Sequence, residues 1–359
     1  MTYEGIAVGI VGLGTQGRRH AETIADLGAD IVGGVDVAPE ARESFADAFD
    51  APAYEDHETL YDDADPDAVV ITTPNCFHEP AAVDAFERDL SVLIEKPLAH
   101  TLESAERLVA AAGDSDGIGM VGFKNRYCAA AEVFDAHREA GRFGDLVRVE
   151  ANFLRRRGAA IGTWFADKEM AGGGALIDIG VHALDFALYL LEFPEIVEVC
   201  GSTRSDLAGR EDYVDPNGWG NPERADEATF DVDDSAVALL RTADGSVITL
   251  DVAWAANRQP TREIIVRGTE AGAEMDLGGA DLAINEVSAE GTDHFVDVDV
   301  EGTLERSALA GEDADFLDAV TAGEPPAMNT LEEGLTVQRL LDAIYRSSEA
   351  GESVTPQRS

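Results

Sequence analysis

The sequence has little positive charge. It contains 26 Lys and Arg residues against 71 Asp and Glu residues among 359 residues, which gives a formal net charge of −45 at pH 7. Only Lys96, Lys124 and Lys168 are lysines. A surface this anionic repels nucleic-acid phosphates and anionic lipid headgroups. We therefore expect no nucleic acid and no membrane surface as a partner.

The acidic residues are spread along the whole chain and do not form a tail. Such self-repulsion destabilises a compact state at low ionic strength, whereas 1 M salt shortens the Debye length to about 3 Å. We therefore expect a halophilic protein, adapted to a salt-rich cytoplasm. The alternative is an acidic protein whose charge serves some other function.

Cysteines and long apolar runs are also scarce. Cys76, Cys128 and Cys200 are odd in number and widely spaced, without a CxxC pair, which argues against a disulfide framework and a zinc site. No apolar run reaches the roughly 18 residues of a membrane-spanning helix. The first residues lack the basic segment of a signal peptide. We therefore expect a cytoplasmic protein.

The length of the chain and its apolar segments predict two domains. A chain of 359 residues with 45% hydrophobic residues is long for one core. Up to residue 123, short and continuously apolar runs alternate with helical stretches, which is typical of a parallel sheet covered by helices on both faces. The expected strands are 6–11, 30–36, 68–72, 90–94 and 118–123, and the expected helices are 15–27, 39–49, 78–88 and 101–112.

From residue 124 onward the pattern changes to alternating apolar and polar residues. This alternation predicts half-exposed strands of a largely antiparallel sheet. The candidate strands are 146–153, 231–241, 246–254, 263–267 and 294–300. Helices are expected at about 175–191 and at 331–348, the latter stopped by Gly351.

A glycine motif, Gly12-Leu13-Gly14-Thr15-Gln16-Gly17, follows the first expected strand and opens the first helix. Its glycines permit a tight turn, bring a pyrophosphate against bare backbone and let the helix pack on the strand. Asp36 ends the second expected strand, where a carboxylate accepts hydrogen bonds from an adenosine ribose. The motif predicts dinucleotide binding, and a strand-to-helix turn with a chance acid is the alternative.

Asp36 also bears on the choice of cofactor. Its carboxylate repels a 2′-phosphate, and Val37 offers no cation in the next position, so NAD is favoured over NADP. Arg18 or Arg42 leaves NADP possible.

Two further motifs stand at the ends of expected parallel strands, where open α/β sheets bind ligands. In Thr72-Thr73-Pro74-Asn75, Asn75 is explained equally well as a ligand or as a helix cap, and His78 is better explained as part of the turn. In Glu95-Lys96-Pro97, the lysine can hydrogen-bond a substrate hydroxyl or act as an acid or base. A solvated surface lysine is the alternative.

A glycine run, Gly172-Gly173-Gly174, precedes a helix that carries Asp178 and His182. Residues four apart project from one face of a helix. An acid beside an imidazole can fix its tautomer or raise its pKa, as acid–base catalysis near neutral pH requires. A metal site and a purely structural pair are the alternatives, and no second His pair or Cys cluster supports a metal.

Together these stretches resemble the glucose–fructose oxidoreductase/inositol dehydrogenase (Gfo/Idh/MocA) family of NAD(P)-dependent sugar and cyclitol enzymes. The closing stretch 329–351 is also similar to the last helix of that family. The resemblance implies an α/β protein with an N-terminal Rossmann domain over 1–123. It also implies an α/β domain over 124–359, whose open, mostly antiparallel sheet serves substrate binding and subunit contact in a homodimer or homotetramer.

The resemblance also implies roles for individual residues. The catalytic residues would be Lys96, Asp178 and His182. The cofactor contacts would come from Gly12, Gly14, Thr15, Gln16, Gly17, Asp36, Thr73, Pro74, Asn75, His78, Glu95 and Lys96. The substrate contacts would come from Lys96, Arg126, Tyr127, Arg157, Trp164, Asp178 and His182, with Asn257 and Arg258 as weaker candidates.

The expected function is a dehydrogenase that transfers a hydride from a hydroxyl-bearing carbon of a sugar or polyol, such as an aldose or inositol, to NAD. His182 would take the hydroxyl proton, Lys96 would polarise the oxygen, and Asp178 would tune the histidine, although Lys96 is an alternative base. One alternative is a glycoside-cleaving or epimerising relative that retains its NAD. Another is a non-catalytic NAD-sensing regulator, which has no need of the three catalytic residues.

Overall fold

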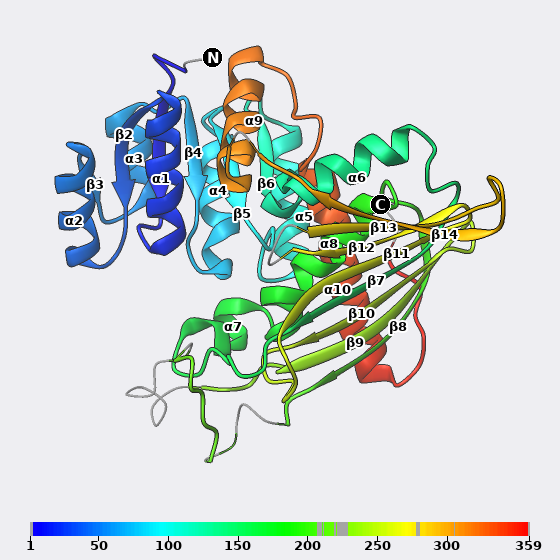
Figure 1. Ribbon diagram of the computed structural model, residues 1–359. Helices are drawn as coiled ribbons and strands as arrows, with labels where there is room; N and C mark the ends of the chain where they lie inside the picture. Colours follow the sequence, from blue (N-terminus) through cyan, green and yellow to red (C-terminus); the bar gives the residue numbers. More distant parts are fainter. Residues whose placement is uncertain are drawn as a thin grey trace. The chain divides into compact units, whose positions relative to one another are not determined.

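The computed structural model describes residues 3–206, 210, 212–218, 220, 229–277, 281–304 and 306–357. The chain divides into two compact units, which are described separately (Figure 1). Unit 1 contains residues 1–124 and 306–338, and unit 2 contains residues 125–305 and 339–359. The expected boundary after residue 123 lies beside this division, whereas residues 306–338, expected in the second domain, belong to unit 1.

Unit 1 is built on a six-stranded parallel sheet in the order β3-β2-β1-β4-β5-β6. Every residue of β4 and β5 is buried, because helices cover both faces of the sheet. The order reverses between β1 and β4, and ligands of such sheets bind at the carboxyl ends beside the reversal. The strands are β1 (Ala7–Val11), β2 (Asp30–Val35), β3 (Ala53–Tyr54), β4 (Ala68–Ile71), β5 (Ser91–Glu95) and β6 (Gly119–Gly122).

The helices of unit 1 begin at recognisable signals. Pro39 opens α2, and the side chains of Asp56 and Thr101 accept backbone N–H bonds at the starts of α3 and α5. The helices are α1 (Thr15–Leu27), α2 (Pro39–Phe49), α3 (His57–Ala64), α4 (His78–Phe86), α5 (Leu102–Gly113) and α9 (Ala308–Ala322), and a 3₁₀ turn, Asn75–Phe77, precedes α4.

The late segment 306–338 returns to unit 1 through contacts that span most of the chain. Helix α9 packs against α1, and the Tyr3 hydroxyl donates a hydrogen bond of 2.9 Å to Asp318. The backbone N–H of Val121 donates to the carbonyl of Asn329 beside β6. The last helix, α10 (Leu331–Ala350), begins after this contact, and the division between the units falls within it.

Unit 2 is built on an eight-stranded sheet in the order β14-β13-β12-β11-β7-β10-β9-β8. Strands β7 and β10 pair in parallel, and the other neighbours pair antiparallel. The strands are β7 (Leu146–Leu154), β8 (Ile196–Arg204), β9 (Ser235–Thr242), β10 (Val247–Ala253), β11 (Thr261–Gly268), β12 (Ala271–Asp276), β13 (Asp281–Ser288) and β14 (His294–Glu301). Together the two sheets make this an α/β protein.

One face of the unit 2 sheet is buried and the other is exposed. In β9, Ala236 and Leu240 are buried, whereas the intervening Val237 and Leu239 are 51% and 43% exposed. Helix α8 (Val181–Leu190) contacts β7 and β10 on the buried face. Further helical elements of unit 2 are a 3₁₀ turn that begins at the boundary (Lys124–Tyr127), α6 (Ala129–Glu139), a second 3₁₀ turn (Trp164–Ala166), α7 (Lys168–Ala171) and a π-helical turn (Leu176–Gly180).

The stretch Lys168–Leu190 is long and apolar enough to cross a membrane by length and composition, which was not expected from the sequence. In the structure, 83% of its most apolar window is buried. The core helices of globular proteins have the same composition, and the burial of α8 under the sheet accounts for this stretch.

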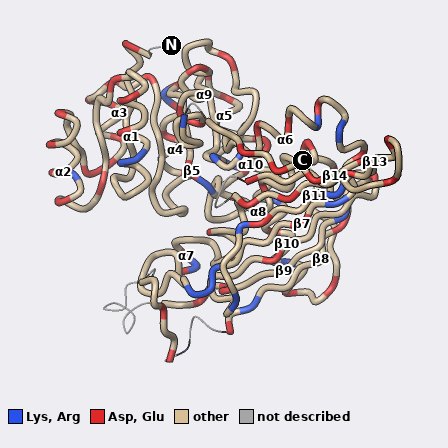
Figure 2. The backbone as a smooth tube through the Cα atoms, viewed as in Figure 1, with Lys and Arg blue, Asp and Glu red and all other residues tan. Residues whose placement is uncertain are grey.

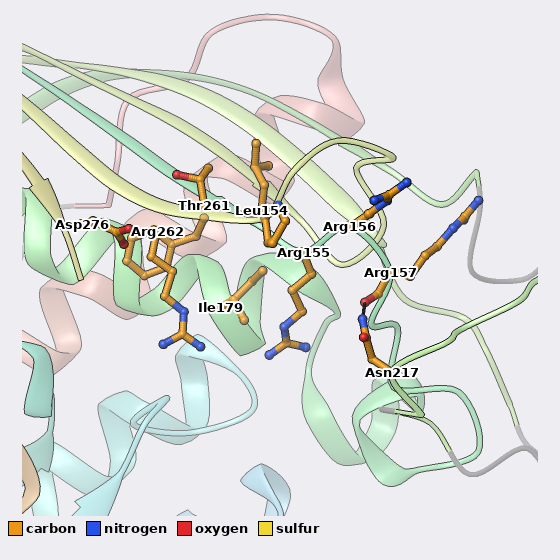
Figure 3. Close-up of a pocket in the computed structure, with 11 residues that line it drawn as sticks. Leu154, Arg155, Arg156, Arg157, Ile179, Asn217, Thr261, Arg262 and Asp276 are labelled. Atoms are coloured by element: carbon orange, nitrogen blue, oxygen red, sulfur yellow. Dashed lines mark hydrogen bonds between the residues drawn. The ribbon is translucent and has the colours of Figure 1, made fainter. Parts of the chain in front are cut away.

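Acidic side chains are spread over both units (Figure 2), but one pocket of unit 2 is lined by arginines (Figure 3). The pocket has a volume of about 350 Å³ and lies where β7 ends and β11 begins. Its lining includes Arg155, Arg156, Arg157, Arg262 and Ile179.

Candidate active site

The glycine motif of unit 1 forms the turn between β1 and α1, and each glycine has a separate steric reason. Gly12 has φ +98°, and a Cβ there would lie 2.9 Å from the backbone carbon of Thr72. A Cβ at Gly17 would lie 1.9 Å from the carbonyl oxygen of Gly12. At Gly14 a Cβ would meet no described atom within 4 Å. The first and third glycines therefore allow close packing, and the second leaves open space against the backbone.

The N-terminus of α1 faces this turn. Gly14 is the N-cap residue, and no side chain of a described residue caps the helix. The first backbone N–H groups of a 13-residue helix carry partial positive charge and bind anions well. Thr15 and Gln16 begin the helix, and the Gln16 side chain donates to Glu95 Oε1 at 3.0 Å. The backbone geometry fits a dinucleotide pyrophosphate.

Asp36 lies directly beside the glycine turn. Its Oδ2 accepts the backbone N–H of Leu13 at 2.9 Å, and its Oδ1 accepts that of Ala38 at 2.8 Å. The carboxylate is thus fixed where a ribose hydroxyl would reach it. Arg42 donates to the backbone carbonyl of Asp36 at 2.6 Å, and the Arg18 guanidinium donates to Ser44 at 2.9 Å.

The segment after β4 is tied to the segment after β5. The Thr72 hydroxyl donates to the carbonyl of Gly12 at 2.7 Å. The two ring nitrogens of His78 lie 2.9 Å from the carbonyl oxygens of Thr73 and Pro97. His78 is 1% exposed, and this burial lowers its pKa. The geometry therefore favours a positioning role for His78 over cofactor contact, although its carried-over cofactor role stays a prediction.

Thr73, Pro74 and Asn75 follow β4 at the reversal of strand order. The hydroxyl of Thr73 is buried and has no hydrogen-bond partner among the described residues. Asn75 is 3% exposed and opens the 3₁₀ turn before α4. A buried hydroxyl without a partner is costly unless a ligand or water satisfies it, and this site fits a cofactor.

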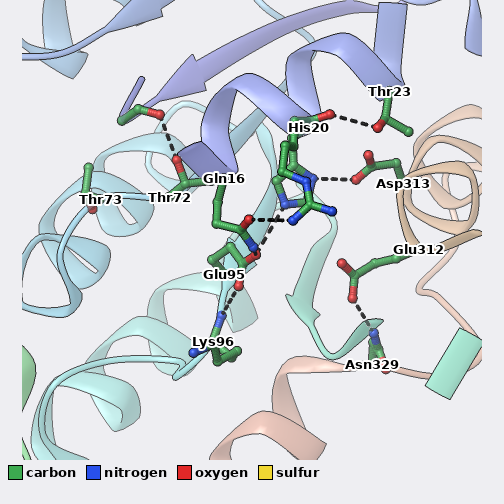
Figure 4. Close-up of polar contacts among 12 residues, drawn as sticks. Gln16, His20, Thr23, Thr72, Thr73, Glu95, Lys96, Glu312, Asp313 and Asn329 are labelled. Carbon is green, nitrogen blue, oxygen red and sulfur yellow. Dashed lines mark hydrogen bonds and ion pairs between the residues drawn. The ribbon is translucent and has the colours of Figure 1, made fainter. Parts of the chain in front are cut away.

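Glu95 is the centre of a buried polar network at the end of β5 (Figure 4). Besides Gln16, its carboxylate accepts the backbone N–H of Lys96 at 3.1 Å. His20 Nε2 lies 3.5 Å from Glu95 Oε1, and His20 Nδ1 lies 2.6 Å from Asp313 Oδ1. Helices α1 and α9 and strand β5 therefore meet through one imidazole. The network fixes the backbone at Lys96. The peptide bond between Lys96 and Pro97 is cis.

The imidazole of this network is charged. Burial by itself would lower the pKa of His20, but the charge and hydrogen bond of Asp313, together with Glu95, raise it to about 10. Burial would likewise raise the pKa of Glu95, but His20, Lys96 and Lys124 hold it well below its ordinary value. At neutral pH, Glu95 is therefore a carboxylate beside an imidazolium.

Glu312 adjoins the same network. Burial, with the nearby Glu95, raises the pKa of Glu312 well above its ordinary value, and the Asn329 amide donates to it at 3.2 Å. His20, Glu312 and Asp313 present possible metal ligands within 4.8 Å of one another. However, the 2.6 Å contact between His20 and Asp313 is a hydrogen bond, which places a proton on the nitrogen that would bind a metal. We assign these residues to a hydrogen-bonded network.

In unit 2, Asp233 fixes the glycine run ahead of Asp178. Its carboxylate accepts the backbone N–H groups of Gly174 and Leu176 at 2.8 Å and 2.9 Å. The hydroxyl of Tyr345 donates to it at 2.7 Å. A Cβ at Gly174 would lie 1.9 Å from the carbonyl oxygen of Asp233, so this position must be glycine for the backbone to approach so closely.

Asp178 and His182 are two partly exposed polar residues of a mostly buried helical segment. Asp178 lies in the π-helical turn and His182 in the first turn of α8. Both are partly exposed, whereas the residues between and beside them are buried. Asp178 Oδ2 accepts the indole N–H of Trp254 at 2.9 Å and lies 3.2 Å from the Arg155 guanidinium. The carboxylate is therefore oriented at an accessible surface.

Comparison with known proteins agrees with these features. Residues 6–123 match an oxidoreductase family with an NAD-binding Rossmann fold, and residues 135–274 match the GFO/IDH/MocA C-terminal domain. The chain is 32% identical over 284 residues to a protein of Amycolatopsis mediterranei (strain S699) assigned as the UDP-kanosamine synthase oxidoreductase subunit, covering 77% of this chain and 75% of that protein. The chain belongs to the Gfo/Idh/MocA oxidoreductase family.

Two other proteins extend the comparison to almost the whole chain. D-glucoside 3-dehydrogenase of Escherichia coli (strain K12) is 27% identical over 365 residues, covering 99% of this chain and 98% of that protein. The structure of levoglucosan dehydrogenase in complex with NADH has a TM-score of 0.86 and 23% identity, over 99% of this chain and all of that chain. The second likeness shows the shared fold. As a family member, the protein is an oxidoreductase with an NAD-binding Rossmann domain.

Not every residue that the Gfo/Idh/MocA resemblance assigns to substrate binding reaches an accessible surface. Arg126 is 1% exposed, and its guanidinium lies 2.5 Å from Asp185 and over the rings of Tyr189 and Phe193. Its charge is therefore used inside unit 2, and the geometry does not favour a substrate contact. Tyr127 is 7% exposed beside it.

The other assigned substrate residues are partly exposed. The Arg157 guanidinium lies over the Tyr213 ring, 5.1 Å from its centroid. Trp164 stacks on Phe165 with ring centroids 3.7 Å apart. Both substrate assignments stay predictions.

Five residues that shape the site were not predicted from the sequence: His20, Asp313, Asp233, Arg155 and Trp254. One signal was available for His20, because it lies between Gly17 and Ile24 on the buried face of α1. A histidine on such a face needs buried partners. The partners of Asp178 and of the glycine run come from distant strands, and no local pattern announces them.

Proposed function

We propose that this protein is an NAD-dependent dehydrogenase that oxidises a hydroxyl-bearing carbon of a sugar or cyclitol. NAD, when bound, accepts the hydride from that carbon. The hydroxyl loses its proton as the C–H electron pair leaves, so the product is a carbonyl compound, with one hydride transferred and one proton released. The residues of the chain therefore have to bind the sugar and to remove one proton.

The observation that carries this proposal is the pair of accessible polar residues, Asp178 and His182, in an otherwise buried helix. Buried helices keep polar groups for a reason, because each one costs free energy unless it is used or paired. In this proposal His182 accepts the hydroxyl proton, and Asp178, held by Arg155 and Trp254, provides a fixed negative charge one helical turn earlier.

Lys96 supplies the second contact with the reacting oxygen. It is partly exposed and follows β5, at the edge of the sheet where ligands of doubly wound folds bind. Its ammonium would stabilise negative charge that develops on the oxygen as the proton leaves. The Glu95 carboxylate fixes the backbone of Lys96, which supports a defined position for this side chain.

We propose that the enzyme uses NAD in preference to NADP. The support is the Asp36 carboxylate, which is fixed at the ribose end of the glycine turn by two backbone N–H groups. A 2′-phosphate would meet this charge at close range. Arg18 and Arg42 are near enough to leave some NADP binding.

We further propose that the protein is a salt-adapted cytoplasmic homodimer or homotetramer. The net charge of −45 supports salt adaptation. The exposed face of the unit 2 sheet supports self-association, since Val147, Val237 and Leu239 are 41%, 51% and 43% exposed there. Light scattering in molar KCl should give a dimer or tetramer mass, and Leu239→Lys should reduce it. A monomer in the unmodified protein would contradict this proposal.

The activity is tested by the absorbance of NADH when the purified protein, in molar KCl, meets NAD and a panel of aldoses, glucosides and inositols. We expect NADH to accumulate with at least one of them. Retention of NAD through purification, with product formed but no net NADH, would favour the glycoside-cleaving or epimerising alternative. NAD binding without any turnover across the panel would favour the regulator.

A further inference from the structure

The arginine-lined pocket of unit 2 differs in charge from the rest of the molecule. Its lining includes four arginines, Arg155, Arg156, Arg157 and Arg262, and one acid, Asp276. The whole chain has only 26 basic residues and a net charge of −45. A chain this poor in cations has concentrated several of them around one cavity of about 350 Å³.

Two of these arginines point into the same space. Figure 3 shows the guanidinium groups of Arg155 and Arg262 extending to the side of the sheet on which Ile179 lies, whereas those of Arg156 and Arg157 extend away from it. Arg262 is the second residue of β11 and alternates in register with the buried Ile264. It therefore lies on the same face of the sheet as Ile264, but it is exposed.

The two guanidinium groups differ in what they already bind. Arg155 lies 3.2 Å from Asp178 Oδ2 and donates to the carbonyl of Gly158 at 3.1 Å. The side chain of Arg262 has no hydrogen bond or ion pair with any described residue. Its planar fork of donors matches the oxygens of a carboxylate or phosphate.

The pocket adjoins the residues of the proposed chemistry. Ile179 lines it, and Ile179 follows Asp178 directly in the π-helical turn. Arg155 lines the pocket and also contacts Asp178. Ligand pockets have volumes of about 300–1,000 Å³. The volume of about 350 Å³ is at the small end of this range and suits a small ligand such as a monosaccharide. A sugar in this pocket would lie beside Arg155, the ion-pair partner of Asp178.

We propose that this pocket binds a sugar that carries an anionic group, a carboxylate or a phosphate, and that Arg262 is the main ligand of that group. This inference rests on the proposed dehydrogenase function and adds the substrate class. Of the two arginines that extend into this space, Arg155 is already paired with Asp178, and Arg262 has no partner among the described residues, so one anionic group is the best fit. Arg155 adds a second cation from the opposite wall of the pocket while it holds Asp178.

The inference is tested with matched sugars in molar KCl: D-glucose, D-glucuronate and D-glucose 6-phosphate, each with NAD. Hydrogen bonds to charged groups are worth about tenfold to a hundredfold in binding. We therefore expect kcat/KM for one anionic sugar to exceed that for D-glucose by about this factor. The better of the two anionic sugars then identifies the group as a carboxylate or a phosphate.

Substitution of Arg262 tests its part in this preference. Arg262→Met should reduce the ratio of anionic to neutral kcat/KM about tenfold to a hundredfold, mainly through KM. Arg262→Lys keeps the charge but not the fork and should restore part of the ratio. The matched control is Arg267→Met, on the same strand but on the opposite face, where Arg267 pairs with Glu150 at 3.3 Å. The control should leave the ratio unchanged.

A binding measurement separates the failure of this inference from the failure of the proposed function. Isothermal titration of the full-length protein with D-glucuronate and D-glucose 6-phosphate needs no turnover. If no sugar is oxidised but one anionic sugar binds and Arg262→Met abolishes the binding, the dehydrogenase proposal fails and the anion site stands. If neutral sugars are oxidised as well as anionic ones and Arg262→Met does not change the ratio, the anion site is refuted and the dehydrogenase stands.

Discussion

Replacement of His20 should destabilise unit 1 more than any exposed substitution. His20 is fully buried between Asp313 and Glu95, and its pKa of about 10 compares with 6.5 for an ordinary histidine. At 1.36 kcal/mol per pH unit, this difference corresponds to about 5 kcal/mol. Removal of one partner from a buried ion pair typically costs about 3–5 kcal/mol, because the remaining charges stay buried. We therefore expect His20→Gln to lose about 3–5 kcal/mol at neutral pH.

The pH dependence separates this charge effect from a simple packing defect. A histidine whose pKa is raised by folding adds stability that is fully present below pH 6.5 and is lost as pH rises through about 10. The difference in stability between the unmodified protein and His20→Gln should therefore shrink as the pH is raised toward 10 and above. A cavity left by the smaller side chain would produce a difference that does not change with pH.

The assay is urea unfolding in molar KCl, followed by far-ultraviolet circular dichroism at several pH values. Tryptophan fluorescence reports on the wrong unit, because every tryptophan of the sequence falls within residues 125–305. Hydrogen exchange in peptides from α1 at neutral pH provides a readout specific to unit 1. The matched control is His57→Gln, because His57 pairs with Asp84 at 2.8 Å but is 23% exposed. Equal stability of the two variants, or a pH-independent difference, would refute the buried imidazolium.

Three further predictions concern the cofactor, salt and the orientation of Asp178. The double substitution Asp36→Ser with Val37→Arg should weaken the use of NAD and improve the use of NADP, measured as the ratio of kcat/KM for the two cofactors. An unmodified enzyme that already prefers NADP would contradict the role of Asp36. Desalting below about 0.1 M lengthens the Debye length to about 10 Å or more, so the acidic side chains repel one another over a longer range. Circular dichroism should then report loss of structure. An unchanged spectrum would argue against salt adaptation. Trp254→Phe removes the indole donor to Asp178. Because one hydrogen bond is worth about 1 kcal/mol, this change should lower kcat several-fold. An equal loss of NAD affinity would indicate general misfolding instead.

The fold of unit 1 was largely predictable because its signals are local. Continuous apolar runs such as β4 and β5 are typical of strands buried on both faces, and the glycine motif marks the turn before α1. The two-residue strand β3 (Ala53–Tyr54) and α3 were not predicted, because an element so short carries no periodicity. Helix α9 was not predicted, and its place in unit 1 depends on packing against α1 from the opposite end of the chain.

The sheet of unit 2 was predictable as a type but not in detail. Alternation identified β7, β9, β10, β11 and β14, whereas β8, β12 and β13 were not singled out. In β13, residues Glu286 and Ser288 alternate with Val287, which is 69% exposed, so the apolar residue there does not mark the buried face. The parallel pairing of β7 with β10 joins segments about a hundred residues apart, and no local pattern encodes it.

The candidate active site was likewise predictable only where its sequence signals are local. The positions of Gly12, Asp36, Lys96, Asp178 and His182 could be proposed from motifs, because each motif is contiguous. The groups that hold them could not. His20 and Asp313 are 293 residues apart in the sequence, and Trp254 is 76 residues from Asp178. Only the folded chain brings such pairs together, and a histidine or tryptophan in isolation gives no sign of its partner.

The most direct test of the account is kcat and NAD affinity measured side by side for the unmodified protein and for His182→Ala, with the best sugar of the panel. General acid–base catalysis is typically worth about 10²–10⁴-fold. We predict a fall in kcat of that order, with NAD affinity, followed by fluorescence, nearly unchanged, because the cofactor contacts proposed here come from unit 1. Near-normal turnover in His182→Ala would contradict the central claim that this residue takes the proton of the substrate hydroxyl.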